Sequence, residues 1–115
     1  MTHKGSCHCG NVAYEVEGEI GKVTQCNCSI CSKRATLLWF VPREHLHLAS
    51  PEPELSTYTF NRHQIEHRFC PTCGIAPFAF AMNREGQPMA AINVRALDDV
   101  DPASLEIVQF DGRSL

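Results

Sequence analysis

Seven cysteines, gathered in three short segments, constrain the fold of this chain more than any other feature of its sequence. The segments are 5–10 (GSCHCG), 26–31 (CNCSIC) and 69–74 (FCPTCG). An odd number of thiols leaves one over when disulfides pair, and clustered thiols in a reducing compartment are typical of metal sites. Zinc binds four such ligands in a tetrahedron, with sulfur about 2.3 Å from the metal. The clusters therefore predict zinc–thiolate sites.

Seven thiols cannot form two sets of four, which favours one closed four-thiolate site and one three-thiolate site with a vacant position. The middle segment holds three thiols within six residues and can surround an ion without help. The outer segments hold two thiols each and are half-sites that need each other, although spacing alone does not decide the pairing. Gly74, after the last thiol, permits a positive φ and lets backbone amides approach the sulfurs. A closed site is structural in character, whereas an open one is catalytic.

The rest of the sequence has the composition of a globular β protein. Its 115 residues are 43% hydrophobic and 20% charged, which fits one folded domain over residues 1–115. Residues 11–17 alternate, with Val12, Tyr14 and Val16 facing one way, as in a half-buried strand. No amphipathic stretch of three or four helical turns is present. We expect a mainly β fold of short antiparallel strands with one or two short helical turns.

Turn-forming residues divide the remainder of the chain into short elements. We expect further strands at 36–41, 55–60, 63–69, 77–82, 89–94 and 106–110. We expect single helical turns at 42–46 and from Asp101-Pro102 through Leu105, a tight turn at Asn61-Arg62 and a loop over 50–53. The aromatic residues expected in the core are Trp39, Phe40, Phe78 and Phe80.

Charge and hydropathy exclude several classes of function. The formal net charge is −3 and no long run of Lys or Arg occurs, which argues against a nucleic-acid partner. No apolar stretch approaches the length that spans a bilayer, so no membrane partner is expected. The first seven residues lack the apolar run of a signal peptide. We therefore predict a cytoplasmic protein whose thiols stay reduced.

In this order, the motifs Gly-x-Cys-x-Cys-Gly, Cys-x-Cys-x-x-Cys and Phe-Cys-x-x-Cys-Gly resemble those of the glutathione-dependent formaldehyde-activating enzyme family, also called centromere-protein-V-like. The resemblance covers nearly the whole chain and extends to residues 93–95 (NVR), 97–98 (LD), 100–101 (VD) and 110–112 (FDG). Each Cys motif alone is weak, but the three together are highly specific. The resemblance implies the Mss4-like zinc-containing β fold.

The resemblance also implies roles for the thiols. It implies a structural zinc, in agreement with the pairing that the spacing favours, at Cys7, Cys9, Cys70 and Cys73. It implies a second, catalytic zinc, whose full or partial occupancy the sequence leaves open, at Cys26, Cys28 and Cys31. The implied reaction joins glutathione and formaldehyde to give S-(hydroxymethyl)glutathione, and its reverse is that of a carbon–sulfur lyase. The implied partners are a small thiol such as glutathione and a small aldehyde.

Other interpretations of the same thiols stay open. In one, all seven cysteines are structural, His8 or another side chain completes the second site, and the protein is a non-catalytic Mss4-like zinc scaffold or binding module. A methionine sulfoxide reductase is discounted, because it needs a separate nucleophilic cysteine late in the chain and no cysteine follows Cys73. Of the other histidines, His67 lies near the third Cys motif and is a candidate to support a metal ligand.

Positive charge is expected near any site for glutathione, because this thiol carries two carboxylates. The basic candidates are Lys33, Arg34, Arg62, Arg68 and Arg95. Most surface cations are merely solvated, and the sequence does not choose among these five.

Overall fold

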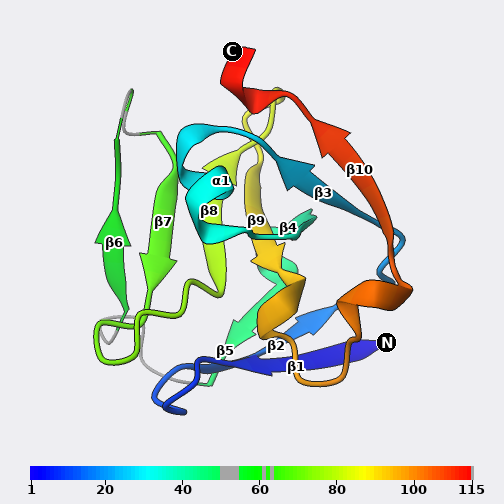
Figure 1. The fold of residues 1–115 in the computed structure, drawn as a ribbon. Helices are drawn as coiled ribbons and strands as arrows, with labels where there is room; N and C mark the ends of the chain where they lie inside the picture. Colours follow the sequence, from blue (N-terminus) through cyan, green and yellow to red (C-terminus); the bar gives the residue numbers. More distant parts are fainter. Residues whose placement is uncertain (50–54, 61, 63, 115) are drawn as a thin grey trace.

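A computed structural model of the protein describes residues 1–49, 55–60, 62 and 64–114. Over these residues the chain is mainly β, as expected, and forms two sheets (Figure 1). The smaller sheet has the strand order β1-β2-β5 and is antiparallel throughout. Its strands are β1 (Thr2–Ser6), β2 (Ala13–Glu17) and β5 (Leu46–Leu48).

The larger sheet has the strand order β10-β3-β4-β9-β8-β7-β6. Its strands are β3 (Lys22–Cys26), β4 (Leu38–Pro42), β6 (Ser56–Tyr58), β7 (Glu66–Phe69), β8 (Phe78–Met82), β9 (Pro88–Asn93) and β10 (Glu106–Phe110). Neighbouring strands are antiparallel except β3 and β10, which run parallel and depart from the expectation of antiparallel strands alone. Parallel strands need a long crossover, and here most of the chain lies between the two.

Helical structure is confined to short segments. The single α-helix of the described residues, α1 (Ser29–Arg34), ends at Ala35, which has a left-handed φ of 55°. The 3-10 turns are η1 (Arg43–His45), η3 (Val94–Ala96), η4 (Pro102–Ser104) and η5 (Gly112–Ser114). At η4 the Asp101 side chain accepts a hydrogen bond from Ala103 N, which confirms the expected cap. No helix in the described parts of the chain could cross a lipid bilayer.

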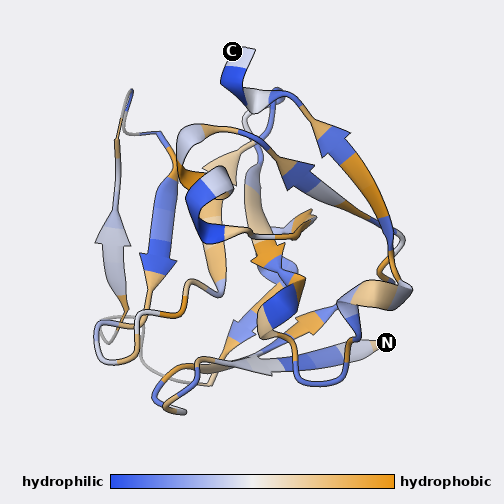
Figure 2. Cartoon of the chain, viewed as in Figure 1, coloured by the Kyte–Doolittle hydropathy of each residue, from blue (hydrophilic) through white to orange (hydrophobic). Residues whose placement is uncertain are grey.

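The core lies between the two sheets. In and just before β2 the side chains of Val12, Tyr14 and Val16 are buried, as their alternation predicted. Two edge-to-face ring contacts join the sheets: Tyr14 meets Phe78 of β8 at 5.2 Å between centroids, and His3 of β1 meets Trp39 of β4 at 5.6 Å. Figure 2 shows that β4, β8 and β9 are largely apolar while β7 is hydrophilic.

Alternation along β4 gives the larger sheet a second, outer face. Trp39 and Val41 point into the core and are buried. Phe40, between them, is 53% exposed, so the expectation that it belongs to the core is wrong, whereas Trp39 and Phe78 confirm that expectation. Successive side chains of a strand point to opposite faces, and Phe40 therefore points away from the smaller sheet. This outer face builds the site described below.

Most of the expected strands are confirmed, with shifted ends. The strands expected at 77–82 and 89–94 form β8 and β9, and the helical turn expected at 42–46 is η1. The tight turn at Asn61-Arg62 and the loop over 50–53 fall wholly or partly outside the described residues. Six elements were not expected, and all of them are short: β1, β3, β5, α1, η3 and η5.

Replacing Gly5 with alanine tests the contact between β1 and the core. An added Cβ would lie 2.5 Å from Tyr14 Cζ, and the Tyr14 ring is 2% exposed and cannot swing into solvent. We expect Gly5→Ala to lower the free energy of unfolding by about 1–3 kcal/mol, as overpacking does. Urea denaturation measures this loss.

Gly21→Ala is the matched control for Gly5→Ala. An added Cβ at Gly21 meets no atom within 4 Å, and its φ is not positive. The control should therefore change the free energy of unfolding by no more than about 0.5 kcal/mol. Equal stabilities of the two variants would contradict the packing of Tyr14 against Gly5.

Candidate metal centres

Four cysteines that are distant in sequence meet at one end of the molecule. This distant cluster consists of Cys7, Cys9, Cys70 and Cys73, whose sulfur atoms all lie within 4.8 Å of one another. The Cys7 and Cys9 sulfurs are 3.5 Å apart, and those of Cys9 and Cys70 are 3.6 Å apart. All four are free thiols, because a disulfide would bring two sulfurs to about 2.05 Å.

Two turns carry these thiols. Cys7 directly follows β1, and its turn is closed by hydrogen bonds from Gly10 N to Cys7 O and from Cys7 N to Val12 O. Cys70 directly follows β7, and Gly74 N donates to Cys70 O across the second turn. Gly10 and Gly74 have φ values of 86° and 82°, which confirms the positive φ expected at Gly74.

Backbone amides make part of this cluster easy to ionise. The N–H of Ile75 is the main cause that lowers the pKa of Cys73 to about 6, and the N–H of Cys73 lowers the pKa of Cys70. The N–H of Val12 donates to the Cys7 sulfur at 3.3 Å. At Cys70 and Cys73 the amides favour the thiolate, which is the form that binds metals.

The distant cluster fits a tetrahedral zinc ion. With zinc–sulfur bonds of about 2.3 Å, the sulfurs of a tetrahedron lie about 3.8 Å apart. The Cys7–Cys9 and Cys9–Cys70 sulfur separations, 3.5 and 3.6 Å, are close to this value. Cys7 and Cys70 are buried and Cys9 is exposed, so the donor set sits at the rim of the core. Four such donors close a coordination shell, as in structural zinc sites.

The other three thiols form a local cluster of Cys26, Cys28 and Cys31, with sulfurs within 4.8 Å of one another. Cys26 ends β3, Cys28 is the N-cap of α1, and Cys31 lies within that helix. The turn from strand to helix thus brings three thiols together, and Cys28 N donates to the Cys26 sulfur at 3.4 Å. Among the described residues, no His, Asp or Glu joins this trio, so His8 does not complete it.

The three thiols of the local cluster differ in acidity. Burial opposes ionisation of Cys28, yet the amides of Cys31 and Ile30 at the start of α1 lower its pKa below the ordinary value. Burial raises the pKa of Cys31 to about 12. Cys28 is therefore the first of this pair to become a thiolate, and a bound cation would favour ionisation of its neighbour as well.

The chain segment after β10 covers one side of the local cluster. Asn27 Nδ2 donates to Asp111 Oδ1 at 2.9 Å, and Arg113 N donates to Asn27 Oδ1 at 2.9 Å. Between these partners, Gly112 lies so close that an added Cβ would be 2.5 Å from the Cys26 sulfur. Sequence reasoning did not assign a role to Asn27 or Gly112. The only signal was residues 110–112, noted as part of the resemblance.

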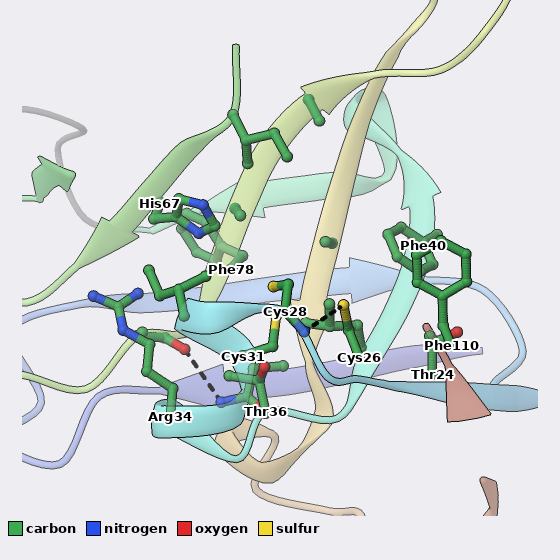
Figure 3. Close-up of a pocket in the computed structure, with 18 of the residues that line it drawn as sticks. Thr24, Cys26, Cys28, Cys31, Arg34, Thr36, Phe40, His67, Phe78 and Phe110 are labelled. Carbon is green, nitrogen blue, oxygen red and sulfur yellow. Dashed lines mark hydrogen bonds between the residues drawn. The ribbon is translucent and has the colours of Figure 1, made fainter. Parts of the chain in front are cut away.

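The local cluster opens into a cavity of about 220 Å³ on the outer face of the larger sheet. Figure 3 shows its three sulfur atoms between His67 and Phe78 on one side and Phe40 and Phe110 on the other. Most of the lining is apolar, and it includes Ile30, Leu38, Phe60, Ile65, Ala76, Ala79, Ala81 and Ala91. The distant cluster contributes no residue to this lining.

His67 lines this cavity and so lies beside the local cluster rather than the distant one. Its ring stacks on Phe60 at 5.5 Å between centroids. Burial and the nearby Arg34 lower the pKa of His67 below its usual range, so the imidazole is neutral near pH 7. Nε2 is buried and has no hydrogen-bond partner among the described groups.

Two of the five expected cations lie at the site. Arg34 lines the cavity, and Lys33 and Arg34 both line an adjoining pocket with Ser29, Ile30, Tyr58, Phe60 and Phe69. Arg68 is buried with its guanidinium over the Phe80 ring, and Arg95 Nε donates to Ala35 O. Arg62 lines neither of these two pockets. Positive charge therefore gathers at the C-terminal end of α1.

Comparison with known proteins identifies the family. The family model described as glutathione-dependent formaldehyde-activating enzyme matches residues 2–110. A solved structure described as a Rhodobacter sphaeroides protein is similar, with a TM-score of 0.78 and 29% sequence identity. The alignment covers 91% of this chain and 99% of that one. With both cysteine clusters formed and the match spanning nearly its whole length, this chain belongs to the glutathione-dependent formaldehyde-activating enzyme family.

Proposed function

We propose that this protein is a zinc-dependent enzyme of the carbon–sulfur lyase type, which makes or breaks the adduct between a small thiol such as glutathione and a small aldehyde. In this proposal the distant cluster holds a structural zinc and the local cluster holds a catalytic one. The observation that carries the proposal is the three-thiol donor set open to a cavity, with no fourth ligand among the described residues.

The donor set of the local cluster suits the proposed reaction. When bound there, zinc would supply a mild Lewis acid with a vacant position, at which a substrate thiol loses its proton or a carbonyl oxygen is polarised. The chain itself supplies Lys33 and Arg34 beside the cavity, where they can hold the carboxylates of glutathione. The apolar lining excludes water around the reacting atoms.

The proposed reaction balances without any oxidant or reductant. The thiol releases its proton, and the sulfur electron pair forms a bond to the carbonyl carbon. The carbonyl π pair moves to oxygen, which takes up a proton. In the reverse direction the carbon–sulfur bond breaks and the carbonyl re-forms. The enzyme therefore has to bring the thiol and the aldehyde together, accept the thiol proton and supply one proton to the oxygen.

Cysteine substitutions separate the two proposed roles. Zinc contributes roughly 10–16 kcal/mol of apparent binding energy in small finger peptides, and a domain is stable by about 5–15 kcal/mol. Cys73→Ala should therefore yield unfolded or aggregated protein. Cys28→Ala should stay folded, lose one zinc and lose activity by more than about 100-fold. Circular dichroism, metal quantification and the rate of S-(hydroxymethyl)glutathione formation measure these effects. If both substitutions lowered the folded fraction equally, the assignment of a structural and a catalytic zinc to the two clusters would be contradicted.

Gly112→Ala tests whether the segment after β10 shapes the local cluster. The new methyl group would push against the Cys26 sulfur, which lies 2.5 Å from the ideal Cβ position, and against Cys28 Cβ at 3.3 Å. We expect zinc at the local cluster to bind about 10–100-fold more weakly, while the zinc at the distant cluster is retained. Competition with a chromogenic chelator measures both affinities. Gly21→Ala again serves as control, and unchanged affinity in Gly112→Ala would count against this packing.

A glutathione titration of metal-loaded protein tests the function itself. We expect two zinc ions per chain. In protein that carries cobalt in place of zinc, we expect glutathione to change the visible spectrum of one metal only, because one site has a free position. The same preparation should accelerate adduct formation from glutathione and formaldehyde. One tightly held metal, no spectral response and no acceleration would instead favour a non-catalytic zinc scaffold.

A further inference from the structure

The floor of the cavity is a row of cross-strand partners on the outer face of the larger sheet. His67 pairs with Ala79, Ala79 pairs with Ala91, and Ala91 pairs with Phe40. Directly paired residues point to the same face of a sheet, so these four side chains form one line across β7, β8, β9 and β4. The two central positions are alanines, which leave a shallow trough between His67 and Phe40.

Aromatic rings form the two ends of this trough. At one end Phe60 stacks on His67, with ring planes inclined by 26°. At the other end Phe40 and Phe110 both line the cavity, and the partner of Phe110 across β3 and β10 is Cys26 (Figure 3). Phe40 is 53% exposed and Phe110 is 46% exposed. The trough is therefore an apolar slot with flat walls, and its thiols come from the local cluster.

The slot is much larger than formaldehyde requires. The cavity that contains the slot has a volume of about 220 Å³. A buried cavity of about 150 Å³ lined by apolar side chains accommodates benzene, whereas formaldehyde has only two non-hydrogen atoms. Formaldehyde would leave most of this apolar surface in contact with water. A ring seated on the two alanines would cover it.

The charged side of the site lies on α1, at the end of the trough that Phe60 and His67 form. Arg34, Ile30 and Phe60 line both the cavity and the adjoining pocket that contains Lys33. An adduct whose sulfur sits at the local cluster can thus extend in two directions. Its carboxylates reach Lys33 and Arg34, and the group on its former aldehyde carbon reaches Ala79 and Ala91.

We propose that the preferred aldehyde carries a flat apolar group, as an arylalkyl aldehyde does, and that this group binds in the slot above Ala79 and Ala91. The proposal rests on the proposed function and specifies its substrate class. The covalent step is the one given above: the thiol sulfur bonds to the carbonyl carbon, and the carbonyl oxygen takes the proton. Nothing is oxidised or reduced.

Stable thioethers of glutathione test the slot without requiring catalysis. S-benzylglutathione places a phenyl ring where the aldehyde-derived group would lie, and S-methylglutathione does not. With zinc-loaded protein, isothermal titration calorimetry should show S-benzylglutathione binding at least about tenfold more tightly, because a single buried methylene is already worth about 10–200-fold in a fitted pocket. In parallel, phenylacetaldehyde should be a better substrate than formaldehyde by kcat/KM with glutathione.

Variants locate the ring. Ala79→Leu fills the floor and should abolish the preference for S-benzylglutathione over S-methylglutathione. Ala103→Leu makes the same chemical change at an exposed position outside the cavity and should keep the preference. Phe110→Ala removes an exposed ring from the wall, and should reduce the preference for the benzyl compound even if Ala79→Leu fails to fold.

The outcomes separate this inference from the proposed function. Equal affinities for the two thioethers, together with accelerated adduct formation from formaldehyde, would contradict the binding of a flat apolar group in the slot. The proposed function would then still hold. Tighter binding of the benzyl compound that depends on Ala79 and Phe110 would support the slot, even if no aldehyde reacted faster. A preference that survives both Ala79→Leu and Phe110→Ala would overturn the assignment to this cavity.

Discussion

The rest of the structure depends on the approach of four sulfur atoms from opposite parts of the chain. Cys7 and Cys9 follow the first strand of the smaller sheet, whereas Cys70 and Cys73 follow β7 of the larger one. Their sulfurs lie within 4.8 Å of one another, and backbone amides lower the pKa of Cys73 to about 6. Cys70 and Cys73 thus ionise more readily than Cys9, whose pKa is raised to about 12. A bound cation would neutralise the thiolate charge and join the sheets, so metal binding and folding are coupled at this point.

Like the sulfur cluster, the ring contacts in the core join the two sheets. Tyr14 against Phe78 and His3 against Trp39 each connect a strand of the smaller sheet to one of the larger. These contacts occupy the inner face of β4 and β8. Successive residues of a strand point to opposite faces, so Phe40 of β4 and Ala79 of β8 lie on the outer face of the same strands. A stable core on one side thus positions an apolar slot on the other.

Particular residues show why the sequence predicted some features and missed others. Val12, Tyr14 and Val16 alternate with polar residues, and this local pattern was sufficient to predict β2 and its buried face. The segments of β1 (THKGS) and β3 (KVTQC) carry no such pattern. Pairing with other strands makes them extended: β1 pairs with β2, and β3 pairs with the distant β10. Phe40 was expected in the core because it is aromatic, but hydrophobicity does not indicate which face of a sheet a residue occupies.

The sequence by itself determined the chemistry of the donors: seven thiols, their grouping into a local trio and two half-sites, and the glycine after Cys73 that allows the turn. These features are local, and spacing within a few residues is enough to identify them. Only the tertiary structure brought the half-sites together, placed Gly112 against Cys26 and put His67 beside the trio instead of the distant cluster. It also created the alanine-floored slot, because strand order and register align side chains that lie far apart along the chain.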